Sequence, residues 1–304
     1  MTEVELRAAD ANDIPLLSEL FRRAWEENRT PSPGEAELHA WITNPTWRAT
    51  DNGRLAFVNG ALAGVIAMWD EDGHGERVFL NVTLHPRDAA VAAALLDWGE
   101  PRAAELVGDD GLVRASAMSG DDVMADELRS RGFTPIRHFF TMEIDLAAEP
   151  AEPAWPDGVG VRTSTPGEER RVYEAMNEAF ADHWDFRPIP FDRWRSFMMA
   201  TEDHDPSLWF LAVEGDEIAG AALCRGERRP GTAHVGILGV RPRWRRRGLA
   251  KALLLHAFRE FRRRGSDRAD LGVDAENATG AVRLYEQVGM QVAARRDTYE
   301  KRLG

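Results

Sequence analysis

The sequence predicts an α/β (α+β) protein of two similar domains in tandem, each with a mixed central β-sheet flanked by helices. Three observations predict it. The chain of 304 residues is longer than one hydrophobic core usually serves. A segment rich in proline and glutamate divides it near the middle, and the strand and helix patterns on the two sides follow the same order.

The dividing segment covers residues 146–158, which hold three prolines and two glutamates among small residues. Such a composition is typical of a semi-extended connector. We therefore expect one domain over residues 1–146, a linker over 147–158 and a second domain over 159–304.

In the first domain, apolar residues alternate with polar ones in the expected strands and recur at helical spacing in the expected helices. Asn59-Gly60 signals a tight hairpin turn between two strands. In chain order we expect strand 4–8, helices 14–25 and 35–41, strands 55–58, 62–69 and 78–84, helix 89–98, strand 112–117, helix 121–131 and strand 135–144.

The second domain carries the same patterns, and Gly215-Asp216 signals its hairpin. In chain order we expect strand 159–163, helices 168–180 and 191–199, strands 208–214, 217–225 and 233–240, helix 249–263, strand 269–274, helix 278–288 and strand 290–302.

Two landmarks support a duplication. Pro86 and Pro242 each follow a strand and lie 156 positions apart, and Gly132 and Gly289 each follow a helix and lie 157 positions apart. Two landmarks at nearly one offset favour an internal repeat over chance.

Composition narrows the class of protein. A hydrophobic content of 43% with 29% charged residues is ordinary for a globular protein, and apolar stretches such as 89–98 and 249–258 are too short or too interrupted to span a bilayer. The net charge of −13 disfavours binding to nucleic acid or anionic membranes. We find no signal-peptide pattern and expect a cytoplasmic protein. Cys224, the single cysteine, excludes an intramolecular disulfide.

The most specific chemical signal is Arg-Arg-Arg-Gly-Leu-Ala at residues 245–250, between a predicted strand and a predicted helix. The N–H groups at a helix start have no intrahelical acceptor, and the helix dipole favours anions there. Gly248 lets the backbone approach a phosphate, and arginines add charge-assisted hydrogen bonds. The alternative is a solvated basic helix start or a nucleic-acid patch, which the acidic chain disfavours.

These residues carry a family resemblance. Residues 239–250 read Gly-Val-Arg-Pro-Arg-Trp-Arg-Arg-Arg-Gly-Leu-Ala, and the stretch from Arg245 resembles the acetyl-CoA signature Gln/Arg-x-x-Gly-x-Gly/Ala of the GNAT acetyltransferases. Residues 277–290 read Asn-Ala-Thr-Gly-Ala-Val-Arg-Leu-Tyr-Glu-Gln-Val-Gly-Met, which is similar to the second signature of that family. The duplication resembles the tandem, two-domain type of the family, so the resemblance covers most of the chain.

The resemblance implies two GNAT-like domains, a cofactor site for acetyl-CoA and roles for particular residues. The strand before the phosphate loop is expected to splay from its neighbour. Its backbone at Leu238, Gly239 and Val240 would bind the pantetheine arm and the acetyl carbonyl, with donors that stabilise an oxyanion. The residues expected to hold the diphosphate are Arg245, Arg246, Arg247, Gly248, Leu249, Ala250 and Lys251.

Two further residues of the second signature acquire roles from the resemblance. Asn277 matches the asparagine beside the pantetheine arm. Tyr285 matches the tyrosine that protonates the departing thiolate, and a phenol can donate a proton to a thiolate whose environment favours the transfer. The alternative for Tyr285 is a helix tyrosine that fills the core.

The general base departs from the family pattern. Many relatives have a glutamate six residues before the last valine of the strand, where this chain has His234. An imidazole with a pKa near 6.5 can accept a proton from an ammonium, directly or through water. The alternative is a solvent-facing histidine at the start of a strand.

The acceptor pocket is expected under the segment that joins the first two helices of the second domain. Its acidic and aromatic side chains suit a cationic amine, although the aromatic ones could equally cap the helices. The candidates are Asp182, His183, Trp184 and Asp185. Cys224 reads as a buried strand residue and not as a covalent nucleophile.

The first domain is expected to be degenerate. From Pro86 to Leu95 there are nine positions where the second domain has eleven, and the arginine cluster and its glycine are missing. Asp88 would repel a phosphate, and Leu128 occupies the place of Tyr285.

We therefore expect a monomeric N-acetyltransferase that transfers acetyl from acetyl-CoA directly to a primary amine of a small molecule, in its C-terminal domain. No metal is expected, because no ligand spacing typical of one is found, and neither nucleic acid nor membrane is an expected partner. The alternatives are acetylation of a protein or peptide amine and a non-catalytic acyl-CoA sensor.

Overall fold

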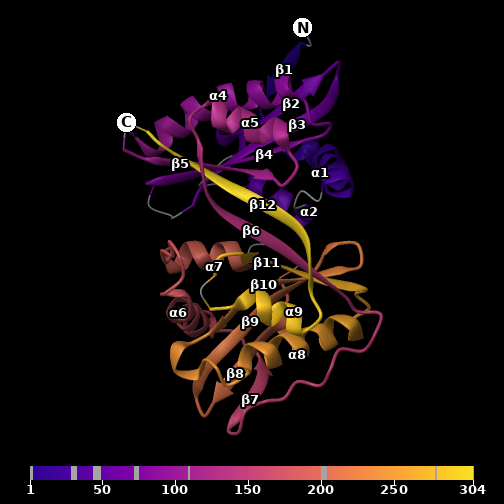
Figure 1. Cartoon of the computed structure of the whole chain (residues 1–304), viewed down its shortest axis with the longest axis vertical. Coiled ribbons are helices and arrows are strands. Elements are labelled where there is room, and N and C mark those ends of the chain that lie inside the picture. The colour runs from indigo at the N-terminus through magenta and orange to yellow at the C-terminus, as the bar shows by residue number, and fades with distance from the viewer. Residues whose placement is uncertain are drawn as a thin grey trace. The chain divides into compact units, whose positions relative to one another are not determined.

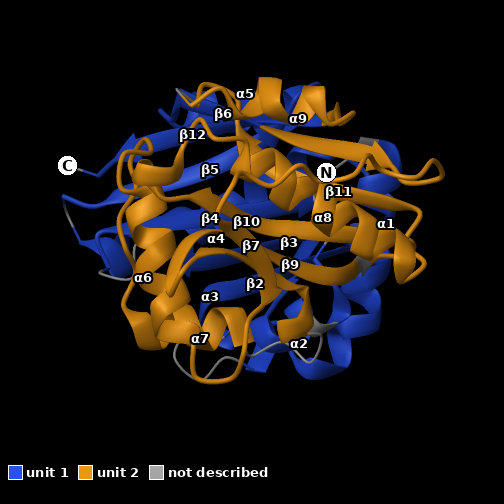
Figure 2. Cartoon of the chain, turned by 90° about the horizontal axis from the view of Figure 1, so that it is seen from below, with its two compact units in different colours: residues 1–139, 294–304 blue, residues 140–293 orange. Residues whose placement is uncertain are grey.

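The computed structural model describes residues 3–28, 33–43, 49–71, 75–108, 110–199, 204–277 and 279–303 (Figure 1). The chain divides into two compact units, one of residues 1–139 with 294–304 and the other of residues 140–293 (Figure 2). We call them unit 1 and unit 2.

Unit 1 is a mixed sheet between two layers of helices. Its strand order is β1-β2-β3-β4-β5-β12-β6, with β4 and β5 parallel and the pairs from β1 to β4 antiparallel. The strands are β1 (Val4–Arg7), β2 (Gly53–Val58), β3 (Ala61–Asp70), β4 (Arg77–Leu84), β5 (Leu112–Met118), β6 (Thr134–Asp145) and β12 (Gln291–Arg302). The α-helices are α1 (Ile14–Asn28), α2 (Glu35–Thr43), α3 (Ala49–Asn52), α4 (Ala89–Val107) and α5 (Asp122–Ser130).

Unit 2 repeats the design, with the strand order β6-β11-β10-β9-β8-β7. The strands first met here are β7 (Val159–Thr163), β8 (Trp209–Glu214), β9 (Glu217–Arg229), β10 (Thr232–Val240) and β11 (Arg268–Asp274). The helices are α6 (Glu169–Phe180), α7 (Phe191–Met199), α8 (Leu249–Arg263) and α9 (Ala281–Gln287). Residue 278, the expected first residue of the last helix, lies outside the described residues.

Each sheet buries both faces. In unit 2, α8 and α9 share one core with β8 to β11, and α6 and α7 form a second core on the opposite face (Figure 1). In unit 1, α4 and α5 cover one face, and α1 and α2 cover the other. Packing of an apolar helix stripe against a sheet face supplies most of the stability of such helices. The predicted mixed sheets flanked by helices are confirmed.

Two strands pass from one unit into the other. Residues of β12 pair with β5 in unit 1, from Arg296 opposite Met118 to Arg302 opposite Leu112. In unit 2, the chain leaving β6 is tied to the sheet by the Leu146 N–H, which donates to the Asp267 carbonyl at 2.8 Å. The compact units are thus divided differently from the sequence ranges 1–146 and 159–304, which remain a prediction about the duplicated domains.

The expected splay is present in unit 2. Parallel pairing of β10 with β11 runs only from Thr232 to Val235 in the described chain, whereas β10 continues along β9 as far as Val240. A register shift between Val235 and Ile237 marks a β-bulge at the point of separation. The corresponding strands β4 and β5 of unit 1 also pair over four positions, from Arg77 to Leu80.

The connector between β6 and β7 has neither helix nor strand and belongs to unit 2. Arg259 of α8 forms ion pairs with Glu149 at 2.9 Å and with Glu152 at 2.7 Å. Arg262 donates to the carbonyl oxygens of Leu146 and Ala147. In the described part of the chain, no helix has the length and apolarity that crossing a membrane requires.

Candidate active site

The last residues of β10 are paired with β9 on one side but are no longer paired with β11 on the other. Leu238, Gly239 and Val240 pair with β9, and beyond Val235 they have left the pairing with β11. A Cβ on Gly239 would lie 2.9 Å from the Met176 sulfur and 3.1 Å from the Ala179 Cβ of α6. Glycine at 239 therefore serves close packing of α6 on the strand, and the predicted role of the three backbones stays a prediction.

The turn after β10 is fixed by a buried tryptophan. Trp244 is 1% exposed, and its indole N–H donates to the Glu214 carboxylate at 2.8 Å. Arg246 then has φ +60° and Gly248 has φ +87°, so two left-handed residues turn the chain into α8.

The start of α8 is open. Gly248 is its N-cap and makes no side-chain hydrogen bond to the helix. The first intrahelical bond joins the Ala252 N–H to the Gly248 carbonyl at 3.0 Å. The N–H groups of Leu249, Ala250 and Lys251 thus have no acceptor within the helix, which is the arrangement that binds anions.

Two of the three loop arginines are engaged in the fold. Arg245 makes two bonds to the Asp182 carboxylate, at 2.5 and 2.8 Å, and donates to the Ala179 carbonyl at 2.9 Å. Those bonds lower the pKa of Asp182. Arg247 forms an ion pair with Glu214 at 2.9 Å. Their guanidinium groups brace the loop against α6 and β8.

The third loop arginine, Arg246, and Lys251 in the first turn of α8 are not engaged in this way. Arg246 and Lys251 are exposed, and their side chains make no hydrogen bond or ion pair with any residue that the structure describes. They are the side chains best placed to meet an anionic ligand at the start of α8.

In unit 1, the start of the corresponding helix, α4, is capped by an aspartate. Asp88 is the N-cap of α4, and its carboxylate accepts hydrogen bonds from the N–H groups of Ala90 at 2.8 Å and Val91 at 3.2 Å. The helix start that would face a phosphate is thus satisfied by the protein's own anion. Leu128, at the place of Tyr285, is fully buried in the core.

Tyr285 lies on α9 with its ring in the unit 2 core and 7% of the residue exposed. Burial raises its pKa to about 12. Its hydroxyl has no hydrogen-bond partner within the described ranges, and it is not among the fully enclosed unpaired polar atoms. A protonated phenol at an accessible point is what a proton donor requires.

Asn277 stabilises its own turn. Its side-chain oxygen accepts hydrogen bonds from the Thr279 N–H at 2.7 Å and the Thr279 hydroxyl at 2.6 Å. These bonds fix the Asn277 side chain against Thr279, and the expected contact with a pantetheine arm remains a prediction.

His234 is held by a carboxylate. Its Nδ1 lies 2.6 Å from Oδ1 of Asp270 on β11, and the histidine side chain is 16% exposed. Arg229 of β9 donates to Oδ2 of Asp270 at 2.6 Å and reaches Glu143 of β6 at 3.3 Å. The histidine is therefore a member of a charged network and not a solvent-facing residue.

The model of the acetyltransferase (GNAT) family matches residues 170–290. A mycothiol acetyltransferase of Paenarthrobacter aurescens is 30% identical over 302 residues, which cover 95% of this chain and 81% of that protein. The chain belongs to the GNAT family of acetyltransferases.

Other similarities differ in extent. The mycothiol acetyltransferase of Streptomyces scabiei is 35% identical over 160 residues, and the match spans about half of each chain, 52% and 51%. Among solved structures, a GCN5-related N-acetyltransferase from Sphaerobacter thermophilus has a TM-score of 0.80 at 30% identity and covers 99% of this chain and 96% of that one. A tandem GNAT protein from the clavulanic acid biosynthesis pathway has a TM-score of 0.74 at 16% identity, with 99% of each chain covered, and supports the tandem fold.

The expected acceptor segment follows α6 of this GNAT domain. His183 packs its ring against Phe180, with centroids 4.5 Å apart, and burial lowers its pKa although the carboxylates of Asp182 and Asp274 oppose the shift. Trp184 is 42% exposed, and Asp185 has φ +55°. The structure thus brings Asp182 to Arg245, in the loop between β10 and α8, and leaves Trp184 on the surface.

Sequence reasoning missed the partners of the site. Asp270, Arg229 and Glu214 anchor His234 and the loop between β10 and α8, and none was singled out. A signal existed for Asp270, because it is the one charged residue in the interior of its strand, between Ala269 and Leu271. Cys224 is buried, and burial raises the pKa of its thiol, so a covalent acetyl-cysteine route is disfavoured.

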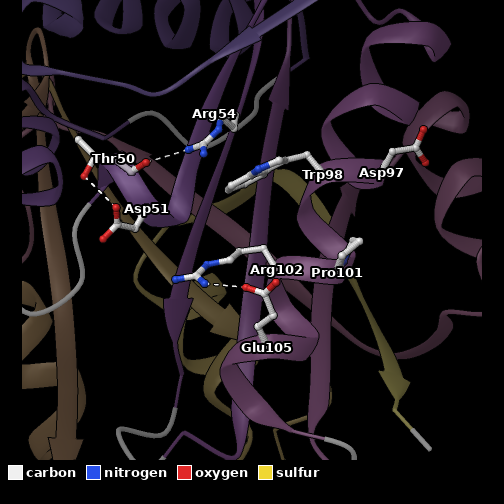
Figure 3. A pocket seen from close by; sticks show the side chains of 8 residues that line it. All are labelled: Thr50, Asp51, Arg54, Asp97, Trp98, Pro101, Arg102 and Glu105. Atoms are coloured by element: carbon white, nitrogen blue, oxygen red, sulfur yellow. Dashed lines mark hydrogen bonds and ion pairs between the residues drawn. The ribbon is translucent and has the colours of Figure 1, made fainter.

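A separate open pocket of about 470 Å³ lies in unit 1, between α3 and the C-terminal half of α4 (Figure 3). The Arg54 guanidinium stacks over the Trp98 ring at 4.3 Å, and Arg102 pairs with Glu105 at 2.7 Å. These cations already have partners, and no residue expected from the sequence to be functional lines this pocket.

Proposed function

We propose that the protein transfers acetyl from acetyl-CoA directly to a primary amine of a small molecule, with its active site in the C-terminal GNAT domain. The observation that carries the proposal is the contrast between the two helix starts. α8 begins at a glycine with unpaired N–H groups beside a splayed strand, whereas α4 is capped by Asp88. An anion at one start would meet donors, and at the other it would meet a carboxylate.

The residues of the α8 start fit the diphosphate of coenzyme A. Gly248 adds no Cβ, and there is open space within 4 Å of the point where one would lie. The N–H groups of residues 249–251 and the side chains of Arg246 and Lys251 would hold the phosphates, and the freed edge of β10 would hold the pantetheine arm. The bound group would supply an acetyl thioester, which is activated for attack by an amine.

The protein's own residues would move two protons. His234 would accept the proton of the attacking amine. Tyr285, whose pKa of about 12 keeps it protonated at neutral pH, would donate a proton to the leaving thiolate. Backbone donors at the end of β10 would stabilise negative charge on the acetyl oxygen.

A small acceptor is supported by the names of the relatives, which are mycothiol acetyltransferases. The family resemblance implies a glutamate at the position of the base, and this chain has His234 there. The segment over residues 180–186, with His183 half-buried beside Phe180, would contact the acceptor. Monomeric state and cytoplasmic location remain predictions.

The test is release of thiol from acetyl-CoA in the presence of small amines, aminoglycosides, cysteinyl pseudodisaccharides and peptides. Release that one small amine stimulates supports the proposal. Stimulation by peptides alone would point to a protein acetyltransferase, and saturable CoA binding with no turnover would point to a sensor. Absence of CoA binding would contradict the proposed function as a whole.

A further inference from the structure

We propose that Asp270 is a positioning residue, which fixes the imidazole of His234 so that its Nε2 accepts the proton of the acceptor amine. The inference rests on the proposed function. It adds a residue from β11 that the family signatures in the sequence do not include.

The register of the sheet builds the pair. His234 on β10 is directly opposite Asp270 on β11, and Val235 opposite Leu271 is the last pair before the strands separate. The two side chains therefore meet one residue before the point where β10 and β11 separate. Asp270 is 7% exposed, and its 2.6 Å contact with Nδ1 of His234 leaves the ring little rotational freedom.

The carboxylate also selects a tautomer. An anion on Nδ1 places the proton of the neutral ring there, and the lone pair then lies on Nε2. As the amine nitrogen bonds to the acetyl carbon and the carbon–sulfur bond breaks, the amine proton moves to Nε2. The resulting imidazolium is stabilised by Asp270. The thiolate takes its proton from Tyr285, and exchange with solvent returns the proton from His234 to the phenolate.

Arg229 also keeps Asp270 ionised and in place. Burial alone would raise the pKa of Asp270, but hydrogen bonds from His234 and from Arg229 outweigh burial and lower it. Glu143 in turn contacts Arg229 at 3.3 Å. Arg225 of β9 is the strand partner of His234 and a further charged residue beside the pair; its guanidinium lies 5.5 Å from the centre of the Phe197 ring of α7.

The experiment is the pH dependence of kcat/KM for the wild type and the Asp270→Asn variant. The rate rises with pH as His234 loses its proton. Without the carboxylate the imidazolium is less stable, so the midpoint of this acid limb is expected to fall by about one pH unit or more. The plateau is expected to fall about 10- to 100-fold, because a mispositioned base loses much of its effect. Affinity for CoA should not change.

Two further measurements keep the test independent of folding and of the proposed function. Proton NMR of the histidine C–H signals, with His234 assigned through His234→Gln, should record the same downward shift in Asp270→Asn. The matched control is Asp216→Asn, which changes an exposed aspartate in the turn between β8 and β9, outside the His234–Asp270–Arg229 network, and it should keep the wild-type limb.

The outcomes are distinguishable. A shared shift of the kinetic and NMR midpoints supports the inference. If the NMR midpoint moves while the kinetic limb of an active enzyme does not, Asp270 has only a structural role and the inference is wrong. No thiol release by the wild type with any amine overturns the proposed function itself.

Discussion

The three adjacent arginines of the phosphate loop have different roles. Sequence reasoning assigned Arg245, Arg246 and Arg247 to the diphosphate together, since the motif does not reveal where each side chain points. Their directions are set by Asp182 and Glu214, which lie 63 and 33 positions from their arginine partners. Partners at such separations cannot be read from a local pattern, whereas the loop itself could be located from its glycine and its arginines.

We expect Arg245 to contribute mainly to stability and Arg246 mainly to cofactor affinity. Arg246→Ala should weaken CoA binding about five- to tenfold, which is about 1 kcal/mol for one exposed charge contact, and leave the melting temperature unchanged. Arg245→Ala should lower the free energy of unfolding by about 1.5–3 kcal/mol, because it leaves Asp182 and two carbonyls without their donor. Calorimetry and thermal unfolding measure the two effects. Equal effects of both variants on stability would contradict the division.

Tyr285 is expected to act without titrating in the working range. Its raised pKa of about 12 means that the phenol remains protonated as pH rises, so kcat/KM should show no falling limb from this residue below about pH 11. Tyr285→Phe should lower kcat about 10²- to 10⁴-fold while CoA affinity stays the same. Because no described residue bonds the hydroxyl, its melting temperature should change little. If Tyr285→Phe keeps the wild-type kcat, Tyr285 is not the proton donor and only fills the core.

Helices and strands were predicted well where the pattern was local. α7 and α8 have the predicted bounds, and both hairpins turn at the expected glycines. The prediction that the first domain's long helix ends near Trp98 is wrong, because α4 continues through Pro101 to Val107. Ala103 is fully buried beyond the proline, and Leu106 and Val107 pack on the same core, so tertiary packing offsets the hydrogen bond that Pro101 cannot donate.

The packing of α6 on β10 gives a prediction for these elements. Gly239→Ala should lower the free energy of unfolding by about 1–3 kcal/mol, because its Cβ would press on Met176, Ala179 and Phe180. The matched control is Gly160→Ala in β7, where nothing lies within 4 Å of the added Cβ. Denaturant unfolding compares the two. A neutral Gly239→Ala would mean that α6 adjusts at no cost and that the end of β10 is less fixed than described.

At the scale of the whole molecule, the sequence predicted two domains of one design but not the passage of β6 and β12 between the units. Alternating patterns identify a strand and its buried face, yet they do not say which sheet edge it will join. The Pro-rich segment that suggested the boundary lies after β6, and it packs along α8 within unit 2.

Cutting the chain should therefore damage unit 1. A fragment of residues 1–158 lacks the part of β12 that pairs with β5, and it loses Tyr299, which is 2% exposed in the unit 1 core. Loss of a large core side chain costs about 3–5 kcal/mol, and an unpaired strand edge promotes aggregation. The fragment should be unfolded or aggregated by circular dichroism and light scattering, and a peptide of residues 291–304 should restore folding. A stable isolated fragment would contradict the importance of β12 to unit 1.

The most direct test of the central claim is a calorimetric titration of CoA into the whole chain and into an Arg246→Ser, Lys251→Ser variant. The claim is that only the C-terminal GNAT domain keeps an open helix start for the diphosphate, because Asp88 caps α4. It predicts one CoA per chain and, since two exposed charges are removed, an affinity reduced about 10- to 100-fold in the variant with an unchanged melting temperature. Two equivalent sites per chain, or one site whose affinity the variant does not change, would contradict the account.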